Sequence, residues 1–270
     1  MDDNINNYTD NSFNLYQAYS YTLLLLVEPT SFSYAVVYQN RLLVSARNCD
    51  LDELAHPKQL SELLSATYKN VIIGLPATSL TLVPKKLFSD SLVPDYARFL
   101  DVKENEEVFA QALDAENNII YKTPGYIAAA VEKFGFQNTV YNAQGWIQAI
   151  GKSYPPDDNL YIEVGKSQVQ ILNFSGRSLR FYNTFEFGHE DDLVYFASLV
   201  AAELRLKPQS ATLVLSGDIS LDDKNMKRLT EFFPKIEING VKISEMPGQI
   251  PSHKLLALAA LSLCGLSEAH

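Results

Sequence analysis

The stretch that decides the fold is residues 159–206, which read NLYIEVGKSQVQILNFSGRSLRFYNTFEFGHEDDLVYFASLVAAELRL. It contains three short segments of alternating or continuous apolar character, and glycine-containing turns separate them: Leu160 to Val164, Gln168 to Phe174 and Leu179 to Phe187. Turn residues between runs of period two are typical of antiparallel strands joined by tight turns. The stretch therefore predicts a three-stranded antiparallel meander.

The pattern then changes from period two to the period of a helix. Apolar residues recur at spacings of three and four, at Leu193, Phe196, Ala197, Val200 and Leu204. The acidic group Glu190, Asp191 and Asp192 precedes them, at the end of the helix where the dipole favours negative charge. An apolar strand from Ala211 follows and runs into a glycine turn at Gly217. The predicted order of elements is meander, helix, strand.

The same order of elements occurs once more, near the start of the chain. Three extended segments are expected first, at Tyr21 to Val27, Phe32 to Tyr38 and Arg41 to Ala46. A helix from about Asp52 to Tyr68 is expected next, and then an apolar strand from Val71 to Pro76. No residue-level identity joins the two halves, so the repeat is one of element order. A repeated order of this kind predicts a duplicated fold.

Composition and charge exclude several classes of protein. The chain has 270 residues, 47% of them hydrophobic, a formal net charge of −10 and a pI near 4.9. Such a charge repels nucleic-acid phosphates, and Lys and Arg form no stripe, so nucleic acid is not expected as a partner. The segment from Gly151 to Asn159 contains two prolines and many turn residues, which is typical of a domain boundary. We expect a polar N-terminal arm at 1–20, a first lobe at 21–152 and a second lobe at 153–270.

The two ends of the chain and its cysteines favour a cytoplasmic protein. The first twenty residues are polar, Asn-rich and acidic, the reverse of a signal peptide, and predict a loose arm. The apolar run from Leu255 to Leu266 is twelve residues long, whereas roughly twenty are needed to cross a bilayer. We read it as a buried helix and expect no membrane insertion. Cys49 and Cys264 lack metal-ligand spacing and are read as small buried residues in a reducing compartment.

The order of elements, together with four short stretches, resembles a known superfamily. These stretches are Ile162 to Leu172, Phe185 to Leu193, Val214 to Ser220, and the segment from Pro124 to Ile150. With the Ala-rich C-terminal helix, they resemble the duplicated ribonuclease-H-like fold of the actin, sugar kinase and Hsp70 superfamily. Within it the chain is similar to the bacterial branch of the pilus assembly protein PilM and the cell-division protein FtsA. It also resembles a family of unknown function with that fold, DUF3822. The expected fold is therefore α/β, with two lobes that each hold a mixed sheet of five-stranded type flanked by helices.

The resemblance implies where a nucleotide would bind. Working members of the superfamily hold ATP between the lobes through an Asp-x-Gly-Thr hairpin in each half, an Asp that coordinates Mg²⁺ through water, and a Gly-Gly turn after a late strand. Glycine allows backbone N–H groups to approach a phosphate closely, and a short carboxylate suits Mg²⁺. Carried onto this chain, the matching positions are Glu28, Thr30, Glu163, Gly165, Lys166, Ser167, Gly188, Ser216, Gly217 and Asp218.

All four matching elements depart from the ATP-binding pattern. Glu28 and Glu163 stand where the resemblance implies Asp, and Pro29 removes an N–H that a phosphate would need. His189 follows Gly188, and Asp218 follows Gly217, where glycine pairs are implied. Each lost contact of this kind costs on the order of 1 to 3 kcal/mol of binding. A degenerate nucleotide cleft is the consequence.

The preferred hypothesis is a non-enzymatic, pseudo-ATPase adaptor or scaffold that binds another protein, with no catalytic residue, no cofactor and no metal. The alternative is a divergent ATPase or small-molecule kinase that takes Mg-ATP. A homo-oligomer with a structural role is a third reading. His189 beside Glu190 and Asp191 is compatible with a metal corner, but helix capping is the simpler interpretation. The aromatic run Phe13, Tyr16, Tyr19 and Tyr21 is compatible with packing on the domain and with contact to a partner, and the sequence does not decide between the two.

Overall fold

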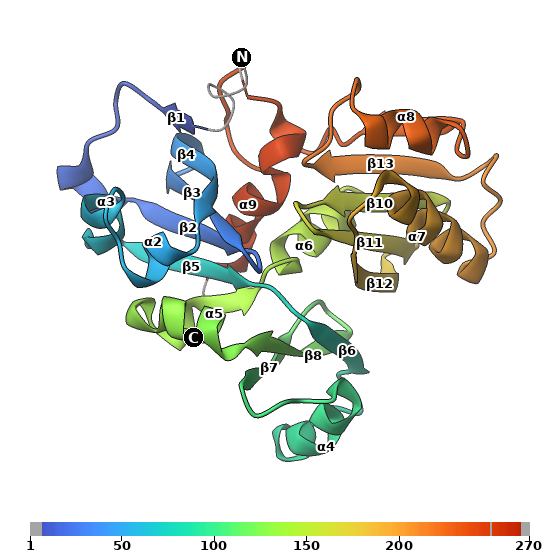
Figure 1. Ribbon diagram of the computed structural model, residues 1–270, viewed down its shortest axis with the longest axis horizontal. Coiled ribbons are helices and arrows are strands. Elements are labelled where there is room, and N and C mark those ends of the chain that lie inside the picture. Colours follow the sequence, from blue (N-terminus) through green and yellow to red (C-terminus); the bar gives the residue numbers. More distant parts are fainter. Residues whose placement is uncertain (1–6, 249, 266–270) are drawn as a thin grey trace. The chain divides into compact units, whose positions relative to one another are not determined.

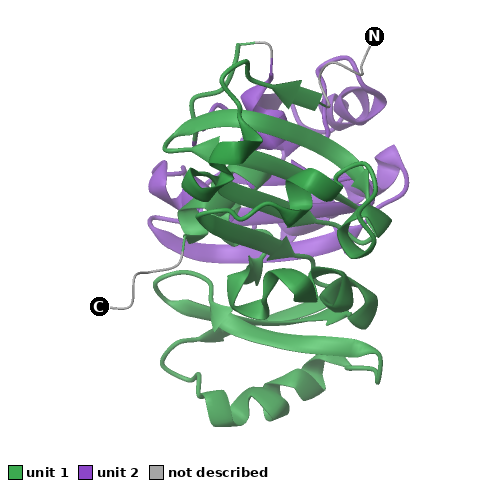
Figure 2. Cartoon of the chain, turned by 90° about the vertical axis from the view of Figure 1, so that its left-hand side faces the viewer, with its two compact units in different colours: residues 1–146, 244–249, 258–270 green, residues 147–243, 250–257 purple. Residues whose placement is uncertain are grey.

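A computed structural model describes residues 7–248 and 250–265 (Figure 1). The chain divides into two compact units, coloured separately in Figure 2. Unit 1 comprises residues 1–146, 244–249 and 258–270, and unit 2 comprises residues 147–243 and 250–257. Leu266, the last residue of the apolar run at the C-terminus, and the first six residues of the expected arm lie outside the described part.

The main sheet of unit 1 is built on the first predicted meander. It has six strands in the order β1-β4-β3-β2-β5-β9. The bounds are β1 (Asn7–Thr9), β2 (Thr22–Val27), β3 (Ser31–Tyr38), β4 (Arg41–Asp50), β5 (Asn70–Leu75) and β9 (Thr139–Tyr141). The strands β2, β3 and β4 pair antiparallel, whereas β5 pairs parallel to β2 and β9 parallel to β5. Five strands were expected, and β1 adds the sixth.

The expectation of a loose N-terminal arm is wrong for the described residues of that segment. Strand β1 pairs antiparallel with β4, and the 3-10 helix η1 (Leu15–Ser20) follows it. The Asp10 carboxylate accepts hydrogen bonds from Tyr8, Ser12 and the Arg41 guanidinium, and its pKa is well below the usual range, chiefly because of the hydrogen bonds from Ser12. One side chain thus ties the segment to the sheet. In η1, Tyr16 and Tyr19 are 94% and 68% exposed.

The helix expected over Asp52 to Tyr68 is broken into two short helices, α2 (Asp52–Ala55) and α3 (Ser61–Ser65). Pro57 lies between them. The Glu53 carboxylate accepts hydrogen bonds from the backbone N–H groups of Lys58 and Leu60, at 2.9 and 3.0 Å. A proline without an N–H and a carboxylate that satisfies the neighbouring N–H groups replace the helical ladder there.

A second, small sheet in unit 1 was not expected as a separate element. It holds three antiparallel strands in the order β6-β8-β7, with bounds β6 (Ser79–Pro84), β7 (Glu106–Ala112) and β8 (Asn117–Pro124). Short helices precede β7: η2 (Asp90–Leu92), α4 (Val93–Ala97) and η3 (Arg98–Leu100). The core of this part is formed by Val83, Leu100 and Ile120. Strands β7 and β8 form a hairpin whose turn consists of residues 113–116.

Helices after β8 complete unit 1 and lead into unit 2. They are α5 (Gly125–Val131), η4 (Glu132–Phe134), η5 (Phe136–Asn138) and α6 (Gln144–Lys152). The C-terminal segment forms η6 (Ser252–Leu255), α9 (Leu256–Ala260) and η7 (Leu261–Cys264), and residues 255–261 are buried, as expected. Within unit 1, Gly145 lies against the backbone of Ala260 with no room for a side chain. Among the described residues, no helix has the length and apolarity needed to cross a membrane.

Unit 2 confirms the meander, helix and strand predicted for residues 159–217. Its five-stranded sheet has the order β12-β11-β10-β13-β14. The elements are β10 (Asn159–Val164), β11 (Gln168–Ser175), β12 (Ser178–Glu186), α7 (Glu190–Glu203), β13 (Thr212–Gly217), α8 (Lys224–Thr230) and β14 (Lys235–Ile238). Strands β10, β11 and β12 pair antiparallel, and β13 is parallel to both β10 and β14.

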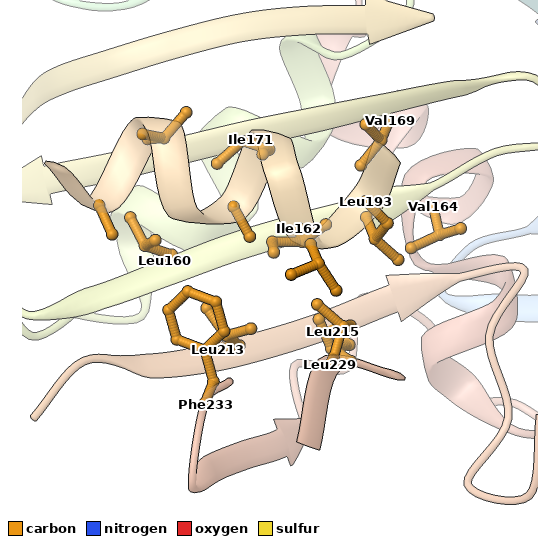
Figure 3. Packing of buried hydrophobic residues seen from close by; sticks show 14 of the residues in the cluster. Leu160, Ile162, Val164, Val169, Ile171, Leu193, Leu213, Leu215, Leu229 and Phe233 are labelled. Atoms are coloured by element: carbon orange, nitrogen blue, oxygen red, sulfur yellow. The ribbon is translucent and has the colours of Figure 1, made fainter. Parts of the chain in front are cut away.

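One continuous hydrophobic core joins the sheet of unit 2 to its two helices. Alternate residues of the central strands, Leu160, Ile162, Leu213 and Leu215, are fully buried and face α7 and α8 (Figure 3). Helix α7 contributes Leu193, Ala197 and Val200, and α8 contributes Met226 and Leu229. Each such side chain contributes roughly 1.5 to 3 kcal/mol on burial. The buried strand residues, which recur at every second position, thus pack against buried helix residues, which recur at every third or fourth position, on one face of the sheet.

A close backbone contact closes the carboxyl end of this sheet. Gly217, at the end of β13, has φ of +86°, and a β-carbon there would overlap the carbonyl oxygen of Val164. The next residue, Asp218, donates its N–H to that same carbonyl at 2.6 Å. Only glycine fits both the positive φ and the contact.

We therefore expect Gly217→Ala to destabilise unit 2 by about 2 to 4 kcal/mol, because the added β-carbon must displace the backbone at Val164. Urea unfolding followed by far-UV circular dichroism measures the change. Gly188→Ala is the matched control, since nothing lies within 4 Å of a β-carbon there and its φ is ordinary. An equal loss in the two variants would contradict the role of this contact.

A buried ion pair holds the small sheet of unit 1. The Lys122 ammonium lies 2.7 Å from the Glu106 carboxylate, and both side chains are nearly buried, at 8% and 11% exposed. Lys122 also donates to the carbonyl of Asp101, and Glu106 accepts from the N–H of Lys103. Hydrogen bonding to Lys122 is the main reason that the pKa of Glu106 is lowered.

Because that pKa is lowered by folding, the stabilisation from Glu106 is complete above the ordinary pKa of glutamate, about 4.3, and is lost as the pH falls through the lowered value. Lys122→Met should cost about 3 kcal/mol at neutral pH, since it leaves a buried carboxylate without its partner. Urea unfolding from neutral pH to about pH 2 should show this penalty shrinking as Glu106 is protonated. Lys103→Met, which removes an exposed side chain nearby, is the control and should change little. A penalty that does not depend on pH would contradict the assignment.

Candidate functional site

The candidate residues of unit 1 lie in the turn between β2 and β3. Glu28 is half-buried and Thr30 is exposed. The N–H of Glu28 donates to the carbonyl of Ser31 at 2.9 Å, and the Ser31 hydroxyl donates to the Glu28 carboxylate at 3.1 Å. The carboxylate is thus bonded within its own turn.

The same turn is held from outside by a residue that sequence reasoning missed. The Tyr126 hydroxyl, from the first turn of α5, donates to the carbonyl oxygen of Pro29 at 3.0 Å. Pro29 has no N–H, and the N–H of Glu28 is already used within the turn. The turn therefore presents a carboxylate and a carbonyl, which are acceptors, where a phosphate would need donors. No local pattern signals this contact, because 97 positions separate its two residues.

The candidate residues of unit 2 are brought together at one end of the sheet. Strand β10 carries Glu163 near its end, the β10–β11 turn carries Gly165, Lys166 and Ser167, and the end of β13 carries Ser216 and Gly217. In the parallel register of β10 and β13, Glu163 lies opposite Ser216 and Val164 opposite Gly217. The pairing of β10 with β13 makes these two stretches neighbours although they are far apart in the sequence.

The individual contacts in this end of unit 2 are mostly backbone bonds of the fold. Gly165 donates its N–H to Gln168 at 2.9 Å, which closes the turn, and the Ser167 carbonyl accepts from Phe187 at 3.0 Å. The Ser216 hydroxyl is buried and donates to the carbonyl of Ile162 at 3.5 Å. Glu163 is buried at 9% exposed, whereas Lys166 and Ser167 are exposed. Of the N–H groups of this turn, that of Gly165 is bonded within the protein.

Gly188 and the residues after it form a helix cap, as the simpler interpretation expected. The N–H groups of Gly188 and His189 donate to the Asp192 carboxylate at 3.0 and 3.1 Å. The N–H of Asp191 in turn donates to Nδ1 of His189 at 3.4 Å. This is a capping box with a histidine as the N-cap residue. In the described ranges, no three His, Cys, Asp or Glu side chains are placed to hold a metal ion.

The acidic first turn of α7 also has partners on α8 that the sequence did not indicate. Lys224 lies 2.9 Å from Glu190, and Arg228 lies 2.7 Å from Asp191. The hydrogen bond from Lys224 is the main reason that the pKa of Glu190 is lowered. Glu190 and Asp191 therefore join the start of α7 to α8. Among the positions matched to the nucleotide site, Lys166 is the cation, and it is exposed.

A cavity of about 460 Å³ lies elsewhere in unit 1, beside α2, and none of the candidate residues lines it. Tyr34, Cys49, Asp52 and Glu53 are among its lining residues. Burial raises the pKa of the Cys49 thiol to about 11 and that of Tyr34 to about 12, so both are protonated at neutral pH. Cys49 and Cys264 are half-buried thiols, whereas fully buried residues were expected. The cavity thus offers no activated nucleophile.

Comparison with known proteins places these features in a fold. None of the curated proteins matches the chain. A protein of Bacteroides thetaiotaomicron, described as having an actin-like ATPase fold and unknown function, matches with a TM-score of 0.74 at 18% identity, over 93% of this chain and 99% of that one. The PilM–PilN type IV pilus biogenesis complex matches with a TM-score of 0.56 at 12% identity, over 91% of this chain and 98% of that one. The cytoplasmic domain of EpsL from the type II secretion system of Vibrio cholerae matches with a TM-score of 0.50 at 13% identity, over 92% and 96%.

These structures confirm the predicted actin-like ATPase fold, α/β with mixed sheets in two lobes. At such low identity they establish the fold and not an activity. The sequence comparison is more specific, because a family model covers residues 10–236, most of the chain. The chain accordingly belongs to the DUF3822 family of proteins of unknown function.

Proposed function

We propose that this protein is a non-enzymatic, actin-like adaptor or scaffold that binds another protein and has lost nucleotide chemistry. The observation that carries the proposal is the β2–β3 turn of unit 1. Its Pro29 lacks an N–H, its Glu28 carboxylate is bonded to Ser31, and Tyr126 already occupies the Pro29 carbonyl. A triphosphate would meet acceptors and negative charge at that turn.

The candidate residues of unit 2 support the same proposal. The Gly217 and Val164 backbones are in contact, so the glycine at the end of β13 serves the fold. The N–H groups of Gly188 and His189 donate hydrogen bonds to the Asp192 carboxylate. Glu163 and Asp218 add carboxylates at the same sheet end. Each departure removes a donor or adds a negative charge, and their effects on phosphate affinity combine.

The solved relatives favour a role in protein binding. One of the similar solved structures is a complex of PilM with PilN. Another is the cytoplasmic domain of EpsL, which is described as an inner membrane component of a secretion system. We infer an equivalent use for this chain, in the cytoplasm, with a protein partner and with no nucleic acid, cofactor or metal. The competing function is Mg-ATP binding by a divergent ATPase or kinase, which the retained Gly165 and Ser167 would favour.

Thermal melting with and without millimolar Mg-ATP separates the two functions. A ligand present at a hundred times its Kd adds about 2.7 kcal/mol, which shifts the melting temperature by several degrees. We expect a shift of less than about 1 °C, because no phosphate cradle is available. Gly165→Val is the control for specific binding. A shift of several degrees that disappears in Gly165→Val would overturn the proposal in favour of the divergent nucleotide-binding protein.

A further inference from the structure

The cavity beside α2 is not used by the proposed function, and most of its lining residues are polar. They come from β1, β3, β4, α2 and the connection from α2 to α3. All of them belong to unit 1. At about 460 Å³, the volume of the cavity lies within the range of small-molecule sites, which is roughly 300 to 1,000 Å³. The cavity is therefore large enough to hold a small ligand.

A bulge in β4 brings part of this lining onto one face of the sheet. On one side of the bulge, Tyr34 of β3 pairs with Ala46 of β4. On the other side, Phe32 pairs with Cys49, so two residues of β4 lie opposite one residue of β3. One of the two, Asn48, has φ of +57°. Because side chains alternate between faces and opposed residues share a face, the extra residue puts Cys49 on the face of Tyr34. Both residues line the cavity.

Tyr34 offers the cavity a hydroxyl group that the fold does not use. The residue is 6% exposed, yet its hydroxyl makes no hydrogen bond with any described residue. Burial, and after it the neighbouring Cys49, raise the pKa of Tyr34 to about 12, so the hydroxyl lies near that thiol and stays protonated. A buried tyrosine hydroxyl usually has a partner, as Tyr68 has in the carbonyl of Leu63 at 3.0 Å. The Tyr34 hydroxyl is thus available to a ligand in the cavity.

The charges of the lining residues favour a positively charged ligand. Three of these residues carry carboxylates, Asp50, Asp52 and Glu53, whereas one carries an ammonium group, Lys58. Lys58 lies 3.3 Å from Asp52 and neutralises that carboxylate. Hydrogen bonds from backbone N–H groups of the following loop lower the pKa of Glu53, so it is ionised at neutral pH. Its charge adds to the effect of burial in raising the pKa of Cys49, which indicates that the carboxylate lies near the thiol. The surplus charge of the lining is negative.

We propose that this cavity binds a small organic cation whose protonated amine donates a hydrogen bond to the Tyr34 hydroxyl oxygen, beside the Glu53 carboxylate. An ammonium group has three donors and no acceptor, which matches a hydroxyl oxygen without a partner and a surplus of carboxylates. An anionic ligand would meet like charge there. Because the Cys49 thiol and the Tyr34 phenol are both protonated, the site binds its ligand without covalent chemistry. This inference goes beyond the adaptor role and does not depend on it.

Isothermal titration calorimetry with cadaverine, an aliphatic diamine, tests the site at neutral pH and about 0.15 M salt, which screens long-range attraction. The wild type should bind cadaverine with a Kd of about 1 mM or lower, and it should not bind the uncharged diol of the same length. Tyr34→Phe should weaken binding roughly tenfold, because it removes the acceptor of a charged donor. The same variant should keep the melting temperature of the wild type, since the hydroxyl makes no hydrogen bond within the described protein.

The neighbouring Tyr68 supplies the matched control, because its hydroxyl is bonded within the fold and Tyr68 is not a lining residue. Tyr68→Phe should lower the melting temperature by about 2 to 4 °C and leave the Kd for cadaverine unchanged. Binding and stability should therefore respond in opposite ways in the two variants. The proposal is overturned if cadaverine does not bind at about 10 mM, if the diol binds equally well, or if Tyr34→Phe binds as the wild type does. A loss of stability in Tyr34→Phe equal to that in Tyr68→Phe would also overturn it, because the hydroxyl would then serve the fold.

Discussion

The parallel pairing of β10 with β13 is the constraint on which the architecture of unit 2 depends. Parallel neighbours cannot be joined by a tight turn, so the chain must cross over through a helix, which is α7. The crossover covers the face of the two central strands that carries Leu160, Ile162, Leu213 and Leu215. In unit 1, β2 and β5 pair in the same way, with α2 and α3 in the connection. The order of elements is therefore repeated because each unit joins two parallel strands through a helical connection.

The same constraint determines where chemically active residues can gather. Parallel strands end at the same edge of a sheet, so residues that follow β10 and β13 become neighbours whatever their separation in sequence. In the superfamily that the fold resembles, this edge faces a nucleotide. In this chain the edge is closed by the bond from Asp218 to Val164 and by the cap on α7. The N–H groups at this edge that are bonded within the protein are those of Gly165, Gly188, His189 and Asp218.

The features that could be predicted from the sequence are the ones that depend on local pattern. Period-two runs with turn glycines predicted β10, β11 and β12, and the acids before a helical period predicted the cap and face of α7. The split of α2 from α3 was missed, because the Glu53 carboxylate closes a loop that the leucine spacing did not reveal. Pro57 was the one available signal.

Contacts between distant residues could not be predicted from one sequence. The hydroxyl of Tyr126 on the Pro29 carbonyl, the Lys224 and Arg228 partners of the α7 acids, and the nearly buried pair of Lys122 with Glu106 all join separate elements. Each depends on where the fold places two side chains, and neither partner has a distinctive neighbourhood in the sequence. The family resemblance identified the candidate residues, but their hydrogen bonds depend on the folded structure and could not be predicted from the sequence.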